Sequence, residues 1–417
     1  MKSGFHAYAN SFQTVSRLGL ERISELLSEL GNPENKLQCL HIAGTNGKGS
    51  VAAYLSSILT EAGYRTGLYT SPNLVSVTER IQISGKQISK GALSLLLDRV
   101  EAACDAVHRR GGELPTQFEI WTAAAFLYFA EQKVDYVVLE TGLGGEFDAT
   151  NVIRSNVLSI LTRIDLDHTE YLGSTLSEIA RTKSKIIKRE SLTKMVVSAP
   201  QCDEVAEVIA KEAVECGSRV IFADPPKPGA YDGICERFSY GGLSLAPSLG
   251  GTHQIENAAV AVEAARAIGI EGGAIVSGIA SAKHPARLEM LSGDPIILYD
   301  GGHNPNGLTA LSASLDRYFR DVRFTVIFAA MRDKEIAPSL ALLSKRAEHF
   351  LFTTVLDNPR AMTPSELSSR ALESGVCGTP VATLADAIEE ASSLGFPILI
   401  CGSLYLYADL PPKLRSI

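Results

Sequence analysis

The sequence predicts an α/β protein of two domains. Short apolar segments of strand length alternate with longer amphipathic segments along the chain, which is the pattern of βαβ units. The 417 residues are too many for one hydrophobic core. The alternation is interrupted near residue 287 and then restarts. We therefore expect a first domain with a mainly parallel sheet over residues 1–287, and a smaller, Rossmann-like domain over residues 288–417.

The first predicted βα unit contains a glycine-rich turn. Residues 37–43 form the apolar run of a buried strand, and residues 51–62 repeat apolar side chains at helical spacing. Between them lies Gly44-Thr45-Asn46-Gly47-Lys48-Gly49-Ser50. Glycines let the backbone approach an anion, the helix N-terminus offers N–H groups, and Lys48 adds a charge. The pattern predicts a phosphate-binding loop (P-loop), and the alternative is an ordinary strand–helix connection.

The loop lacks one element of the usual pattern. Gly49 follows the lysine where a serine or threonine would hold magnesium. Ser71 lies in a polar turn after the predicted strand 65–69, and Glu140 ends the predicted strand 134–139. Ligands of α/β sheets bind at the carboxyl ends of strands, so both side chains are candidate magnesium ligands. The alternatives are a plain turn serine and a solvated carboxylate.

A third polar cluster follows the predicted strand 157–161. The cluster contains Asp165, Asp167 and His168. The alternative is a structural or surface histidine, because a lone histidine is more often one of these than a ligand. The place of His168 at a third strand end favours a functional role. Residues 176–188 are predicted to form a helix with several basic side chains, among them Lys183, for which a solvated basic face is the simplest interpretation.

The remaining segments complete the α/β pattern. Further helices are predicted at residues 20–30, 92–107, 118–132, 202–216, 254–267 and 308–319. Further strands are predicted at residues 81–83, 196–198, 220–222, 296–299, 324–329, 349–353 and 398–401, with a hairpin at 238–245.

Composition narrows the function class. The formal charge of −8 argues against a general nucleic-acid surface. The best apolar run, residues 123–130, is too short to span a bilayer, and the first residues, MKSGFHAYANSF, lack the apolar core of a signal peptide. The seven cysteines are scattered without a CxxC pair. We expect a cytoplasmic, monomeric protein with small-molecule partners and neither nucleic acid nor membrane.

Together, the motifs resemble the folylpolyglutamate synthase/dihydrofolate synthase family of the Mur ligase superfamily over nearly the whole chain. The segments that carry the resemblance are 19–23, 44–50, 68–72, 79–81, 140–145, 148–151, 167–168, 253–257, 285–289, 300–305 and 402–405. The resemblance implies an N-terminal ATPase domain and a C-terminal ligase domain.

The resemblance also implies a reaction. ATP would phosphorylate a carboxylate, and the amine of L-glutamate would attack the acyl phosphate to give an amide, ADP and phosphate. The acceptor would be dihydropteroate or the terminal γ-carboxylate of a folate. A Mur-type ligase with another carboxylate acceptor is the nearest alternative, and a nucleotide-binding regulatory protein without ligation is the second.

The resemblance assigns the site residue by residue. Lys48, Lys183 and His168 would be catalytic. Ser71 and Glu140 would hold one Mg²⁺, and His168 a second, helped by a carbamylated Lys183. The nucleotide would contact Thr45, Asn46, Gly47, Lys48, Gly49, Ser50, Asn257, Arg287, Asp300 and His303. The acceptor pocket would include Thr116, Gln117, Phe118 and Asp148.

Three departures from the family pattern concern this site. Thr182-Lys183-Ser184-Lys185 stands where Glu-Lys-Ala-Gly is frequent, so Lys185 is an alternative lysine for the carbamate. Glu146 stands where arginine is common, and Asn73 where histidine is frequent. Altered residues on the acceptor side, beside an unaltered ATP side, indicate that the acceptor itself can differ.

Overall fold

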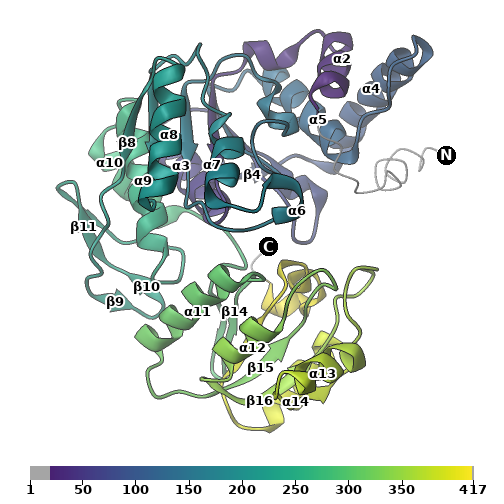
Figure 1. Ribbon diagram of the computed structural model, residues 1–417, viewed down its shortest axis with the longest axis vertical. Helices are drawn as coiled ribbons and strands as arrows, with labels where there is room; N and C mark the ends of the chain where they lie inside the picture. Colours follow the sequence, from purple (N-terminus) through teal and green to yellow (C-terminus); the bar gives the residue numbers. More distant parts are fainter. Residues whose placement is uncertain (1–18, 416–417) are drawn as a thin grey trace. The chain divides into compact units, whose positions relative to one another are not determined.

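The computed structural model describes residues 19–415. Its chain divides into two compact units, the first formed by Met1–Pro226 and Glu256–Ala282, the second by Lys227–Ile255 and Lys283–Ile417 (Figure 1). The predicted boundary after residue 287 stays a prediction, although residues 227–255 pack with the second unit. The N-terminal segment inspected for a signal peptide lies outside the described residues.

The first unit is built on an eight-stranded sheet with the order β4-β3-β2-β5-β1-β6-β7-β8. The central strand β1 (Cys39–Ala43) is buried along its whole length and pairs in parallel with its two neighbours. Continuous apolar runs of this kind are typical of strands covered on both faces. The other strands are β2 (Thr66–Tyr69), β3 (Ile81–Ile83), β4 (Lys86–Gln87), β5 (Tyr136–Glu140), β6 (Leu158–Leu161), β7 (Met195–Ser198) and β8 (Arg219–Phe222).

The register of the parallel strands places their polar carboxyl ends side by side at one end of this sheet. Ile42 of β1 lies opposite Glu140 of β5, and Ala43 lies opposite Leu161 of β6. Tyr69, the last residue of β2, lies opposite Leu139. The turns after β1, β2, β5 and β6 therefore leave the sheet at the same end, which is the carboxyl end of these parallel strands. Among the described strands of this sheet, β3 pairs antiparallel with both β2 and β4, so β3 alone runs against the common strand direction.

Helices cover the sheet in separate groups. The helices α2 (Glu21–Glu29), α4 (Lys90–Arg109) and α5 (Gln117–Glu131) pack on one another around one apolar core. A second core lies under α7 (Leu176–Ser184) and α8 (Asp203–Glu215), which lie side by side in Figure 1. The loop helix α3 (Lys48–Glu61) packs on α10 (Gly272–Ser281). The unit also contains α6 (Thr169–Leu172), η1 (Pro33–Lys36), η2 (Val77–Arg80) and η3 (Ala149–Val152), and α9 (Gln254–Ala267) crosses its boundary.

The second unit has a six-stranded sheet with the order β13-β14-β18-β15-β16-β17, parallel except for β13. Its strands are β13 (Glu289–Gly293), β14 (Ile296–Tyr299), β15 (Phe324–Phe328), β16 (Ala347–Phe352), β17 (Thr379–Pro380) and β18 (Ile398–Cys401). Its helices are α11 (Pro305–Tyr318), α12 (Ala337–Leu343), α13 (Pro364–Glu373), α14 (Leu384–Ser393), η4 (Leu404–Asp409) and η5 (Pro412–Leu414). Two small hairpins precede this sheet, β9 (Tyr231–Asp232) with β10 (Cys235–Glu236), and β11 (Phe238–Tyr240) with β12 (Leu243–Leu245).

The predicted fold class is confirmed, with one correction to a helix. The helix predicted over residues 176–188 ends at Ser184. Its next carbonyls are taken by side chains instead of helical amides: Asn151 Nδ2 donates to Lys185 O at 3.3 Å, and Ser159 Oγ donates to Ile186 O at 3.1 Å. The alternative interpretation, a solvated basic face, does not hold for Lys183, which is only 4% exposed, whereas Arg181 of the same helix is exposed. Among residues 19–415, no helix combines the length and apolarity that crossing a bilayer requires.

Candidate active site

The glycine-rich turn joins β1 to α3 and brings two lysines onto one carbonyl. Lys48 Nζ donates to Gly44 O at 3.0 Å, and Lys183 Nζ donates to the same oxygen at 2.9 Å. Gly47 has a φ of +90°, which favours glycine, and a Cβ there would collide with the side-chain oxygen of Asn257. The predicted nucleotide residue Asn257 therefore lies against the loop.

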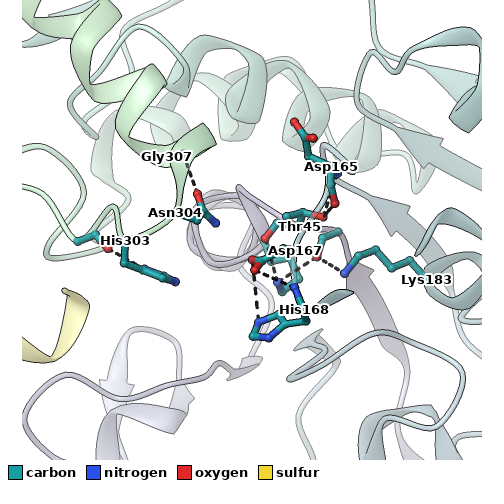
Figure 2. Close-up of polar contacts among 11 residues, drawn as sticks. Thr45, Asp165, Asp167, His168, Lys183, His303, Asn304 and Gly307 are labelled. Carbon is teal, nitrogen blue, oxygen red and sulfur yellow. Dashed lines mark hydrogen bonds and ion pairs between the residues drawn. The ribbon is translucent and has the colours of Figure 1, made fainter. Parts of the chain in front are cut away.

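The cluster after β6 supports the same turn. Thr45 Oγ1 donates to Asp165 O at 2.9 Å and accepts from Asp165 N at 3.0 Å. The backbone N–H of Thr45 donates to Arg163 O at 2.9 Å. Figure 2 shows Lys183 reaching from α7 toward this loop, with Thr45 and Asp165 bonded beside it. The segments after β1 and β6 thus form one polar surface.

Lys183 is the most perturbed group of this surface. Burial, together with the positive charge of Lys48, lowers its pKa from 10.5 to about 7, while Asp167 and Asp148 oppose the shift. Near pH 7 a substantial fraction of this amine is therefore neutral. Lys185, the alternative lysine, is bonded to Glu212 Oε2 at 2.7 Å, and this hydrogen bond raises its pKa.

His168 and its neighbour Asp167 lie at the start of α6. His168 is exposed and has a φ of +49°, a conformation that brings its backbone N–H to Asp167 Oδ1 at 2.9 Å. Its ring Nε2 lies 3.9 Å from Asp167 Oδ2. The Asp167 carboxylate acts electrostatically on Lys183, so the predicted second-metal residues belong to one electrostatic cluster.

Ser71 and Glu140 meet at the ends of β2 and β5. The Ser71 backbone N–H donates to Glu140 Oε2 at 3.1 Å, and the Glu140 side chain is buried. No group of three or more His, Cys, Asp or Glu side chains within the described part of the chain has the arrangement of a metal site. Mg²⁺ is commonly held by one or two protein oxygens, with water and phosphate oxygens completing the shell. The Glu140 carboxylate, held at the backbone of a residue that carries a hydroxyl, fits a magnesium ion of that kind.

The predicted acceptor residues gather around the start of α5. Thr116 caps this helix, accepting from Glu119 N at 3.3 Å. The next residue is Gln117, and then Phe118, whose ring packs on Gly142: a Cβ at Gly142 would lie 2.6 Å from the ring. The ring of Tyr69 lies 6.1 Å from that of Phe118. The rings of Tyr69 and Phe118 thus give the predicted acceptor site an aromatic side.

Asp148 organises the loop that follows β5. It is buried and accepts from Leu143 N at 2.8 Å, from Thr150 N at 3.0 Å and from Thr150 Oγ1 at 2.5 Å. Burial raises the pKa of this carboxyl group, and the hydrogen bonds oppose the shift. On the other side of the loop, a Cβ at Gly145 would lie 2.7 Å from Thr182 O and 2.8 Å from Lys183 O. The loop therefore contacts both the acceptor residues and the Lys183 backbone.

The second unit holds the other predicted nucleotide residues. Asp300 accepts from Leu288 N at 2.9 Å and from Gly302 N at 2.8 Å, and His303 Nδ1 lies 3.0 Å from Gly301 O. Asn304 caps α11 by accepting from Gly307 N at 2.8 Å, as Figure 2 shows.

Arg287 belongs to the same cluster of the second unit. Burial and the Arg287 guanidinium together lower the pKa of His284 to about 3. The sequence motifs assigned no role to His284 or Asn304, although Asn304 lies within the motif 300–305 and His284 directly precedes the motif 285–289.

Comparison with known proteins agrees with these motifs. The Mur ligase middle domain matches residues 42–265, and the Mur ligase glutamate ligase domain matches residues 286–404. The Bacillus subtilis dihydrofolate synthase/folylpolyglutamate synthase is 35% identical over 418 residues, covering 95% of each chain. The chain belongs to the dihydrofolate synthase/folylpolyglutamate synthase family. The family that the motifs indicated is thus confirmed.

Solved structures of this family have the same fold. Mycobacterium tuberculosis folylpolyglutamate synthase, complexed with ADP and AMPPCP, superposes with a TM-score of 0.88 at 31% identity, covering 97% of this chain and 96% of that one. The Escherichia coli relative in complex with DHPP and ADP has a TM-score of 0.84 at 30% identity, covering 97% and 95%. The roles of individual site residues stay predictions.

Proposed function

We propose that this chain is an ATP-dependent ligase that joins L-glutamate to dihydropteroate, to the terminal glutamate of folates, or to both, through an acyl phosphate. The observation that carries this proposal is the cluster at the sheet edge, where Lys48 and Lys183 share the Gly44 carbonyl and Ser71 meets Glu140. Family membership supports it, as do the nucleotide and DHPP in the structure of the E. coli relative.

The reaction brings two anions together, so the site must neutralise charge. Residues 44–50 would wrap the phosphates, with Lys48 on the outer ones and Asn257 beside Gly47. Ser71 and Glu140 would hold Mg²⁺, which supplies positive charge next to the transferred phosphoryl group. In the second unit Arg287, Asp300 and His303 would contact the nucleotide. Positioning and electrostatics then account for most of the catalysis.

Lys183 would carry a carbamate that helps His168 hold a second Mg²⁺. Carbon dioxide adds to a neutral amine: the nitrogen lone pair forms the N–C bond, and one N–H proton leaves to solvent. The lowered pKa of Lys183 favours this step, whereas Lys185 is held protonated by Glu212. The carbamate would also replace a cation with an anion beside the metal, which removes a repulsion.

Thr116, Gln117, Phe118 and Asp148 would form the acceptor site. A planar pterin suits the Phe118 ring and a nearby carboxylate. Glu146 lies on the loop that follows β5, two residues before Asp148, and its negative charge acts on Lys185. A shifted acceptor preference is therefore the second candidate, as a Mur-type ligase with another carboxylate acceptor.

The deciding experiment compares glutamate-dependent ADP formation with dihydropteroate and with tetrahydrofolate side by side, with the products identified by mass. A product heavier than the acceptor by one glutamyl residue supports the proposal. Turnover only with another carboxylate acceptor would reassign the substrate. ATP binding without glutamate-dependent turnover on any acceptor would favour the nucleotide-binding regulatory protein and overturn the ligase.

We propose further that the enzyme works as a monomer in the cytoplasm, without nucleic acid or membrane partners. The net charge of −8 supports this, as does the lack of disulfide pairing among the seven cysteines, all of which the structure describes. Light scattering coupled to size-exclusion chromatography tests the mass: a peak near twice 44.6 kDa would contradict the monomer.

A further inference from the structure

His41 is a polar residue in the middle of the apolar central strand β1. The side chain has no exposed surface, and its strand neighbours are Leu40 and Ile42. Burial and the charge of Lys188 keep the pKa of the imidazole well below 6.5, so the ring is neutral. Its Nδ1 has no hydrogen-bond partner among the residues that the structure describes. A buried polar atom without a partner destabilises a fold by about 1–3 kcal/mol, so an apolar residue would be more stable here.

The other ring nitrogen begins a directed chain of hydrogen bonds. His41 Nε2 lies 2.8 Å from Thr150 Oγ1, and Thr150 Oγ1 donates to Asp148 Oδ1 at 2.5 Å. A threonine hydroxyl has a single hydrogen, which is given to the carboxylate. Thr150 must therefore accept from His41, which places the ring proton on Nε2 and leaves Nδ1 as the bare acceptor.

The chain of hydrogen bonds ends in the acceptor loop. Asp148 accepts from the N–H of Leu143, and the preceding Gly142 packs on the ring of Phe118. Thr150 has no exposed surface, so its hydroxyl serves this contact and no ligand. Thr150, which accepts from His41, thus orients the Asp148 carboxylate, and that carboxylate holds the loop that packs on the ring of Phe118.

We propose that His41 and Thr150 are positioning residues for the carboxylate acceptor: through Asp148 and Leu143 they hold the loop of residues 142–145 against Phe118. This inference rests on the proposed function, since the loop that the two residues hold is assigned to the acceptor site only there. Both side chains are fully buried, so neither is exposed to a bound substrate. If stability alone determined this position, either both ring nitrogens of the histidine would be hydrogen-bonded or an apolar residue would stand there. Here one ring nitrogen has no partner among the described residues.

The test uses two matched pairs of variants in the full chain. His41→Leu removes the donor, while His41→Gln keeps an amide N–H at the place of Nε2. Thr150→Val removes the hydroxyl, while Thr150→Ser keeps it. The measurements are kcat, the KM values for dihydropteroate, ATP and L-glutamate, and amide hydrogen exchange of the peptide that contains Leu143.

His41→Leu and Thr150→Val are expected to raise the KM for dihydropteroate about three- to tenfold, which corresponds to the net value of one hydrogen bond, and to leave the KM for ATP within about twofold. Exchange at Leu143 should accelerate in both. The Gln and Ser variants should restore the wild-type values, and His41→Leu should not lower the melting temperature.

An unchanged dihydropteroate KM in both Leu and Val variants would overturn the proposal. So would an equal rise of all three KM values, or a loss of stability without an effect on the acceptor, because either result indicates a core role only. If His41→Leu does not fold, the Thr150 pair decides. If the wild type turns over no acceptor, the proposed function fails, and the exchange at Leu143 alone decides whether His41 and Thr150 hold the loop.

Discussion

Replacing Lys183 by methionine should stabilise the protein while removing its activity. Methionine is an unbranched, flexible side chain that follows the path of lysine as far as Cε and carries no charge. The side chain of Lys183 is buried, and its pKa falls from 10.5 to about 7. Burial is the first cause and the Lys48 charge the second. The protonated form is therefore the unfavourable one in the folded protein.

The magnitude follows from linkage. The unfolded chain keeps a proton on this amine up to pH 10.5, whereas the folded chain loses it near pH 7, so the unfolded state binds more protons between these values and stability rises with pH. At pH 7 the penalty is about 4 kcal/mol, and at pH 9.5 it is about 1.4 kcal/mol.

Methionine loses the hydrogen bond to Gly44 O, worth about 1 kcal/mol, but that oxygen still accepts from Lys48. The net gain of Lys183→Met is about 3 kcal/mol at pH 7, or roughly 5–10 °C in the melting temperature, and it nearly vanishes at pH 9.5.

Thermal unfolding of wild type and Lys183→Met, at pH 7.0 and 9.5 in metal-free and CO₂-free buffer, measures this difference. Lys211→Met, an exposed lysine on α8, is the matched control and should change neither stability nor turnover. A variant that is less stable than wild type at pH 7, or a difference that does not depend on pH, would refute the buried neutral amine. Full glutamate-dependent turnover in Lys183→Met would remove the lysine from the mechanism.

Three further substitutions test other parts of the site. Lys48→Ala should abolish ligation but leave the unfolding transition intact, since its side chain bonds only the loop's own carbonyls among the described residues; unchanged turnover would dismiss the phosphate role. Gly145→Ala should lower kcat about tenfold or more, because its Cβ would push on the backbone of Thr182, whereas Gly91→Ala, with open space around it, should have no effect on steady-state kinetics. Glu140→Gln should lower kcat by about 100-fold and shift the Mg²⁺ titration to higher concentrations, and an unshifted titration curve would exclude this carboxylate as a ligand.

The central strands could be predicted because their sequence pattern depends only on burial. The strand β1 lies between two parallel neighbours and is covered on both faces, so apart from His41 its sequence is an apolar run. The edge strand β13 (Glu289–Gly293) was missed, since its half-exposed residues give no such run. Local pattern therefore finds the centre of a sheet more readily than its antiparallel edge.

The assignment of residues 227–255 to the second unit could not be predicted from their place in the chain. It depends on side chains that meet only in the folded protein: Glu236 is buried and accepts from Arg317 Nε at 2.9 Å and from Tyr318 OH at 3.2 Å. The guanidinium also lies over the ring of Tyr231, 5.1 Å from its centre. These contacts join a hairpin to a helix some 80 residues later in the chain. Contacts between such distant residues leave no periodic pattern in the sequence.

Two chemically informative residues show the same limit. Helical periodicity gave Lys183 a solvated face, but in the folded protein its backbone packs on the loop after β5 and its buried side chain reaches Gly44 O. The pattern placed His41 in a buried strand but was silent on its polarity, because its partner Thr150 is 109 positions away. The signal available in sequence was a histidine inside an otherwise apolar strand, which is an expensive residue to bury without a reason.

The glycines of the loop after β5 have a common physical explanation in these contacts. Gly142 leaves room for the ring of Phe118, and Gly145 leaves room for the backbone of Lys183, so the loop is thin where it meets each neighbour. Asp148 holds it from behind through Leu143. Gly142 and Gly145 meet their neighbours through the backbone itself, so a displacement of either neighbour would act directly on the backbone of the loop. Under the proposed assignments, an acceptor on Phe118 would contact the same loop that packs on the backbone of Lys183, so this one loop would link the acceptor to the amine that is proposed to carry the carbamate.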